Sequence, residues 1–142
     1  MTRALDLAMT PEELRGRTKR FAIDIIRFCG FLPQTDESRI IRRQLLRAGT
    51  AVGANYRAAC RPRSRPDFIA KLGIVIEEAD ETSYWLELLA EAGLVTPTAA
   101  TGLHQEAEAL TRIFVSSRAT ARRNAHAVGE PRPQSQIANR KS

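Results

Sequence analysis

The chain has 142 residues, a length that suits a single domain with one hydrophobic core. Aliphatic residues and Ala far outnumber aromatic residues, which favours helices over a sheet. A formal net charge of +6 makes nucleic acid, acidic lipid or an acidic protein the plausible class of partner. The sequence lacks a signal peptide and any apolar run near the roughly 18 residues of a membrane span, so we expect a cytoplasmic protein with no membrane partner.

The first predicted helix begins with a complete start signal. Thr10 is the cap, Pro11 is the first helical residue, and Glu13 can bond back to the cap. Apolar residues then recur at helical spacing until Leu32, and Pro33 ends the pattern. These features predict an amphipathic helix over about residues 11–32.

The second predicted helix begins near residues 36–38 and carries an apolar stripe from Ile41 to Ala59. Gly49 and Gly53 lie inside it, where each glycine costs roughly 1 kcal/mol relative to alanine. We therefore expect a neighbouring backbone to approach closely at this place. That neighbour belongs either to the same chain or to another subunit.

The third and fourth predicted helices follow similar start signals. The third opens at residues 64–67 and ends at Gly93, a natural helix terminator, and the fourth runs from Thr96 to about Arg123. The third helix is apolar beyond one stripe, which predicts contact with other copies of the chain. The expected interface residues are Gly49, Gly53, Tyr84, Trp85 and Leu88.

Four amphipathic helices joined by short connections predict an all-α fold, an antiparallel up-down-up-down four-helix bundle. The expected domain covers residues 10–125. Residues 126–142 are rich in Pro, Gln, Ser, Asn and Arg without periodicity, which predicts a disordered basic tail.

Charge is segregated along the second and third helices. Residues 39–65 contain eight arginines and no acid, whereas residues 77–91 contain six acids and no base. Antiparallel packing brings Arg47 near the acidic run, so we predict a structural ion pair that is buried between the helices. Its members are Arg47, Glu77, Glu78 and Glu81. Asn55 beside the apolar stripe is interpreted as a buried amide that fixes helix register.

The topology also gathers cations at one end of the bundle. The start of the first helix, the turn between the second and third helices and the end of the fourth helix meet there. A solvated surface normally mixes charge signs, so this end is a candidate for binding phosphates without reading bases. Its residues are Arg15, Arg17, Lys19, Arg20, Arg57, Arg61, Arg63, Arg65, Lys71, Arg118, Arg122 and Arg123.

Catalytic and metal chemistry find little support in the sequence. Di-iron bundles need Glu-x-x-His pairs, but Thr101 and Arg123 precede His104 and His126 by three residues. No other metal or nucleotide motif is present. Cys29 and Cys60 have no histidine nearby on their helices and should lie at opposite ends of the bundle, too far apart for a disulfide. We therefore expect no enzymatic activity, no metal and no cofactor.

The sequence over residues 20–115 resembles a family of small bacterial four-helix bundle proteins, grouped with the protein encoded in intervening sequences of 23S ribosomal RNA genes. The motif residues are Gln44, Leu45, Arg47, Ala48 and Asn55, then Glu81, Leu86, Glu87, Leu88 and Leu89. The chain departs from the family pattern where Ala58 and Ala59 replace a glutamate and Thr50 replaces a serine. The missing acid leaves the turn more cationic than in the relatives.

The family resemblance implies a homo-oligomer. Its relatives include the accessory variability determinant of diversity-generating retroelements, which is similar to a five-fold ring that binds nucleic acid and a reverse transcriptase. A pentamer is therefore the assembly that the resemblance favours. We predict a non-enzymatic scaffold whose cationic end binds RNA or DNA. The alternative is a protein-interaction module that docks an acidic partner, such as a reverse transcriptase or another nucleic-acid enzyme.

Overall fold

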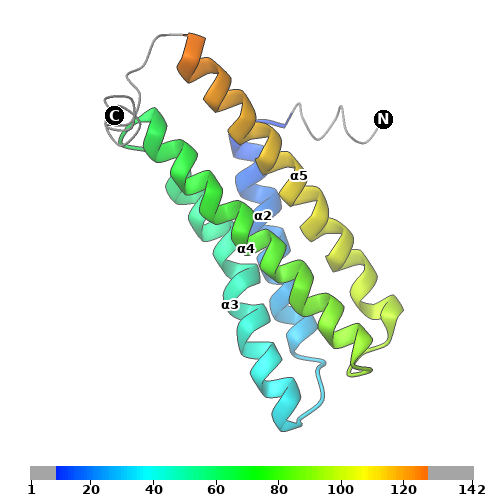
Figure 1. The fold of residues 1–142 in the computed structure, drawn as a ribbon. Helices are drawn as coiled ribbons and strands as arrows, with labels where there is room; N and C mark the ends of the chain where they lie inside the picture. Colours follow the sequence, from blue (N-terminus) through cyan, green and yellow to red (C-terminus); the bar gives the residue numbers. More distant parts are fainter. Residues whose placement is uncertain (1–8, 128–142) are drawn as a thin grey trace, which may run out of the picture.

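The computed structural model describes residues 9–127, and this part of the chain forms an antiparallel four-helix bundle without strands (Figure 1). The all-α up-down-up-down prediction is confirmed. Its helices are α2 (Pro11–Cys29), α3 (Asp36–Ala59), α4 (Arg65–Glu91) and α5 (Pro97–Ala127).

The predicted start signals form as hydrogen-bonded caps. In α2, Glu13 N donates to Thr10 Oγ1 at 3.1 Å and Thr10 N donates to Glu13 Oε2 at 3.1 Å. In α4, Asp67 N donates to Ser64 Oγ at 3.2 Å. Gly93, at the end of α4, has a φ of +74°, a conformation that glycine adopts without strain. These local bonds satisfy helix termini and fix where the chain turns.

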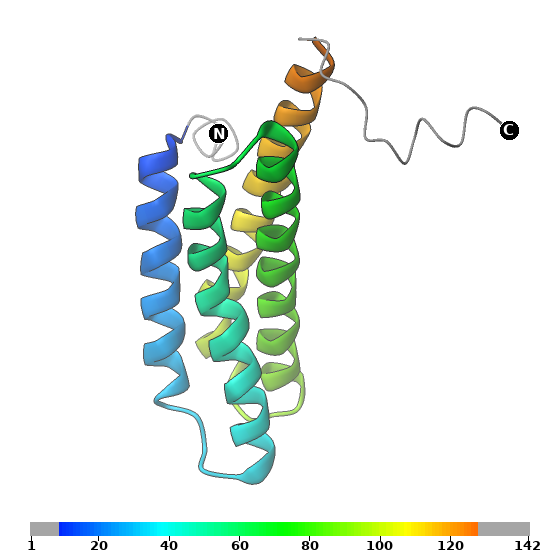
Figure 2. The ribbon, with the colours of Figure 1, turned by 90° about the vertical axis from the view of Figure 1, so that its left-hand side faces the viewer.

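Helices that follow one another in sequence pack along their lengths, whereas α2 and α5 touch over a much shorter stretch. The core is the line of fully buried side chains between them, which includes Phe21, Leu45, Leu72 and Phe114. The Tyr56 and Phe114 rings pack against each other at a tilt of 44°, with centroids 4.9 Å apart. Because α2 is held mainly by α3, the α2–α3 pair is a distinct face of the molecule (Figure 2).

The two glycines of α3 face α2 of the same chain. A Cβ on Gly49 would lie 2.9 Å from two side-chain carbons of Ile25, and one on Gly53 would lie 3.3 Å from the Thr18 backbone. The neighbour that approaches both glycines closely therefore belongs to the same chain and not to another subunit. That contact buries Gly49, so Gly49 is not available to another subunit in this bundle. Its predicted place in an intersubunit interface is therefore wrong.

The remaining predicted interface residues lie on α4. Tyr84 is 53% exposed, and Trp85 and Leu88 are partly buried, so a face of α4 does carry apolar side chains toward solvent. The Tyr84 and Trp85 rings meet edge to face at 5.0 Å.

The end of the last helix differs slightly from the prediction. Helix α5 continues beyond the predicted end near Arg123 and includes residues 126 and 127, the first two of the predicted tail. The rest of that predicted tail, residues 128–142, lies outside the described residues. Among residues 9–127, no helix combines the length and apolarity needed to cross a bilayer.

Candidate nucleic-acid interface

A groove of about 850 Å³ runs between α2 and α3 at the end of the bundle where α2 begins and α3 ends. Four cationic side chains line it, and we call this surface the basic groove: Arg15, Lys19, Arg57 and Arg61. Glu12 is the acidic residue of the lining. All four cations are exposed, so their charged groups are available to a ligand.

Sequence spacing explains the groove. Arg15 and Lys19 are four residues apart on α2, so they lie on one side of that helix. Arg57 lies in the last turn of α3, and Arg61 follows in the turn after Cys60, the C-cap of α3. The surface between them is lined by residues with little or no side chain: Gly16, Ala22, Gly53 and Ala54. Small residues leave a hollow where two helices pack, and long cationic side chains stand at its rim.

Two of the predicted phosphate-binding residues are bonded to carboxylates of the same chain, and a third is partly buried. Arg17 bonds Glu106 of α5 through two nitrogens, at 2.9 and 2.7 Å. Lys71 Nζ donates to Asp67 at 2.9 Å, one turn away. Arg118 is partly buried, with its guanidinium beside Gly73 of α4. Carboxylates of the same chain therefore compete with a phosphate for Arg17 and Lys71, whereas Arg118 stays a predicted binding residue that does not line the groove.

The other predicted residues do not line the groove. Arg20, Arg63, Arg122 and Arg123 are exposed, whereas Arg65 is partly buried at the start of α4. The start of α2, the α3–α4 turn and the end of α5 lie at one end of the bundle, as expected (Figure 2). The cations at this end are thus spread over several faces, and the basic groove is the place where four of them converge on one hollow.

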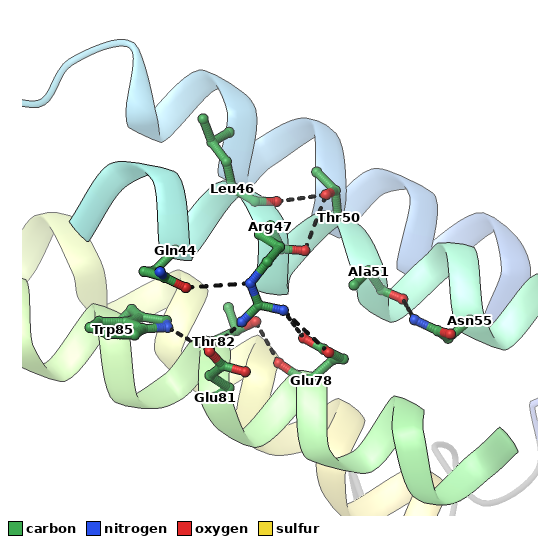
Figure 3. Close-up of polar contacts among 10 residues, drawn as sticks. All are labelled: Gln44, Leu46, Arg47, Thr50, Ala51, Asn55, Glu78, Glu81, Thr82 and Trp85. Carbon is green, nitrogen blue, oxygen red and sulfur yellow. Dashed lines mark hydrogen bonds and ion pairs between the residues drawn. The ribbon is translucent and has the colours of Figure 1, made fainter. Parts of the chain in front are cut away.

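The predicted ion pair forms, with two of its three expected acids (Figure 3). Arg47 Nη1 lies 3.2 Å from Glu78, Nη2 bonds Glu81, and Nε donates to Gln44 at 3.3 Å. Trp85 Nε1 also donates to Glu81, at 3.2 Å. Hydrogen bonding from Arg47 holds the pKa of the Glu81 carboxyl below its usual range.

Two parts of that ion-pair prediction are wrong. Glu77 is exposed on α4, and the acids that contact Arg47 are Glu78 and Glu81, although Glu77 lies one turn before Glu81. The pair is also not buried, since the Arg47 side chain is 48% exposed. Arg47 lies on the rim of the α3–α4 interface, so its long side chain reaches the acids over the surface. Asn55 likewise bonds within its own helix, to Ala51 O at 2.8 Å, and does not bridge to α4 (Figure 3).

The cysteines are free, as predicted. Cys29 ends α2 and Cys60 follows α3, so they lie at opposite ends of the bundle. Burial raises the pKa of the Cys29 thiol to about 11, outweighing the nearby Arg42, so Cys29 remains a neutral thiol.

One cluster of possible metal ligands was not predicted from the sequence, because it combines residues of two helices. Glu87 on α4 and His104 and Glu108 on α5 place a donor atom each within 4.8 Å of one another. The spacing of His104 and Glu108 at i and i+4 is a signal that the sequence does carry. The third member comes from another helix, so only the fold reveals it.

The fold and its contacts define a helical bundle with a two-helix basic groove at one end. The chain belongs to the 23S rRNA-intervening sequence protein family, whose model matches residues 13–116. It is similar to a protein of unknown function from the S23 ribosomal protein family of Bacteroides thetaiotaomicron VPI-5482, with 34% identity and a TM-score of 0.69. The match covers 73% of this chain and 96% of that one. No curated protein matches the sequence.

Proposed function

We propose that the protein is a non-enzymatic, oligomeric helical scaffold that holds nucleic-acid phosphates in its basic groove. The observation that carries this proposal is the convergence of Arg15 and Lys19 of α2, Arg57 of α3 and Arg61 of the following turn on one hollow of about 850 Å³. Cations clustered in this way bind a polyanion by replacing its counterions. The small residues between them allow a backbone to approach closely.

The groove supports affinity more than sequence recognition. Its cations suit phosphate oxygens, and phosphate contacts position a nucleic acid without reading its bases. Tyr84 and Trp85 belong to α4, outside the groove lining, and Trp85 is hydrogen-bonded to Glu81. We therefore expect RNA and DNA of different sequence to bind alike. RNA is the first probe to use, because the family description names a ribosomal RNA.

Removing the four groove charges tests the proposal. Replacement of Arg15, Lys19, Arg57 and Arg61 by Gln should leave the fold intact, because all four are exposed. If each contacts one phosphate, the plot of log affinity against log salt should become shallower by roughly 3 to 4 units. The measurement is titration of a fluorescent single-stranded RNA and a duplex DNA at several salt concentrations.

A matched control removes the same charge elsewhere. Arg27, Arg39, Arg43 and Arg112 are also exposed and do not line the groove, and their replacement by Gln changes the net charge equally. This control should lose much less affinity. Equal loss in both variants would mean that only net charge matters, and unchanged binding in the groove variant would contradict the proposal.

A second candidate rests on the same observation, because guanidinium groups bind carboxylates as well as phosphates. In this case the groove docks an acidic protein, such as a reverse transcriptase. The two functions separate when the protein is purified from its native cells without nuclease treatment. Protected nucleic acid that is lost with the groove charges favours the scaffold, whereas an acidic partner without nucleic acid favours the docking module.

A further inference from the structure

We propose that Glu87, His104 and Glu108 form a binding site for a divalent transition-metal ion, with Zn²⁺ as the best-fitting ion. The site joins α4 to α5 at the opposite end of the bundle from the basic groove. It is independent of nucleic-acid binding. Among residues 9–127 it is the one group of His, Cys, Asp or Glu side chains with this proximity.

The distances suit a small ion. His104 Nε2 lies 2.7 Å from Glu87 Oε1 and 3.6 Å from Glu108 Oε1, and the three donor atoms lie within 4.8 Å of one another. Two ligands of a tetrahedral zinc ion are separated by about 3.4 Å, which follows from metal–ligand distances of about 2.1 Å. Small side-chain movements are therefore enough to bring all three donors into the coordination shell.

The donors are accessible. The side chains of His104, Glu87 and Glu108 are 25%, 49% and 50% exposed, and all three line a hollow of about 450 Å³. An ion and its waters can reach them without unfolding the bundle. Three protein ligands also leave a coordination position for water, as in zinc sites that are open to solvent.

The local charge favours a cation. The sequence contains no Lys or Arg between Lys71 and Arg112, and the last turn of α4 has no basic residue. Glu91 lines the same hollow and adds a further negative charge. Arg112, one turn beyond Glu108, is exposed and does not line the hollow.

The ligand types select the ion class. An imidazole nitrogen suits Zn²⁺ and its transition-metal neighbours, whereas Mg²⁺ and Ca²⁺ prefer oxygen ligands alone. Two carboxylates and one neutral imidazole also balance the charge of a divalent ion. Without metal, His104 forms a hydrogen bond with Glu87, and Glu108 lies nearby.

Isothermal titration of the full chain with ZnCl₂ tests the site. We expect one Zn²⁺ per chain, with a Kd of about 10 μM or tighter, and no saturable binding of MgCl₂ at the same concentrations. His104→Ala and Glu108→Gln should each weaken zinc binding at least about tenfold. His126→Ala is the matched control, because His126 is an exposed histidine of the same helix, and it should bind zinc as the parent does.

A second readout reports whether the bound ion stabilises the folded bundle. Zinc should raise the melting temperature of the parent and of His126→Ala, because a ligand that binds the folded state stabilises it. The rise should be smaller in His104→Ala and in Glu108→Gln at the same zinc concentration, because both bind zinc more weakly. Circular dichroism of the metal-free variants checks that they fold. Zinc affinity unchanged in both variants, or no saturable binding below about 100 μM, would overturn the site.

Discussion

At the residue scale, the arginines and lysines of this chain divide according to what lies within reach of each side chain. Arg17 and Arg47 connect different helices through carboxylates, and Lys71 pairs one turn back along α4. The groove residues instead face an open hollow from which acids are largely missing. Net charge alone does not distinguish these roles, since an internally paired arginine counts the same as a binding one.

The exposure of Arg47 sets the size of its contribution. Its partners are two carboxylates, but ion pairs at a solvent-exposed rim typically contribute 1 kcal/mol or less. We therefore expect Arg47→Ala to lower the free energy of unfolding by about 1 kcal/mol or less, measured by urea denaturation at neutral pH. A loss near 3 kcal/mol would show that the pair behaves as a buried one.

The pH dependence of the stability lost in Arg47→Ala tests whether Arg47 acts through a carboxylate. Because the pKa of Glu81 is lowered in the folded protein, the ion pair stabilises the fold fully above the usual carboxyl value of 4.5. This contribution disappears as the pH falls through the lowered folded-state value and Glu81 becomes protonated. The stabilities of Arg47→Ala and the parent should therefore converge in acid. A difference that persists to low pH would mean that Arg47 contributes through packing.

At the element scale, the α2–α3 pair depends on glycine. The side chain of Ile25 is fully buried and packs directly on Gly49, so it cannot move aside easily. Gly53 makes the second close approach and also lines the basic groove. Gly53 thus both lets α2 approach α3 and leaves part of the hollow between the cations.

This packing predicts that Gly49→Ala is destabilising although alanine favours helices. The gain in helix propensity is roughly 1 kcal/mol, but crowding a packed core costs about 1 to 3 kcal/mol. We expect a net loss on the order of 1 kcal/mol in thermal or urea unfolding.

Gly102→Ala is the control, since Gly102 lies in α5 with no atom within 4 Å of an added Cβ. It should stabilise the protein by up to about 1 kcal/mol. If both substitutions stabilise, α2 and α3 pack less closely at Gly49 than described.

At the scale of the whole molecule, the fold could be predicted because local signals agree with one another. Caps at Thr10 and Ser64, apolar periodicity and Gly93 each mark a helix boundary that the structure reproduces closely. Short connections then leave the antiparallel bundle as the natural topology.

The sites were predicted less well, because they depend on which side of each helix a residue occupies relative to its neighbours. Reasoning by bundle end placed Arg17 and Lys71 in the binding set, although Glu106 and Asp67 bond them. Glu77 was assigned to the ion pair from its position along α4, but the acids that pair with Arg47 are Glu78 and Glu81. Glu87 meets His104 only through the α4–α5 packing, which no spacing within one helix encodes.

The solvent-facing side of α4 carries the last prediction, the assembly of the chain into a homo-oligomer. Ile74 is 43% exposed and Tyr84 is 53% exposed, with Leu88 partly buried on the same helix. Apolar side chains on one exposed helix face are typical of a surface that another subunit covers. We expect light scattering to give a mass several times 15.8 kDa.

Charge placed on that face should dissociate the oligomer. Ile74→Glu combined with Tyr84→Glu should lower the mass toward that of one chain, because an interface does not accommodate unpaired buried carboxylates. Ile40→Glu is the control, since Ile40 is 65% exposed on α3 and outside this face. Helical circular dichroism should be retained in all three proteins, because each altered residue is exposed in the single bundle. A monodisperse monomer for the parent at micromolar concentration would refute the assembly, and dissociation by Ile40→Glu alone would move the interface from α4 to α3.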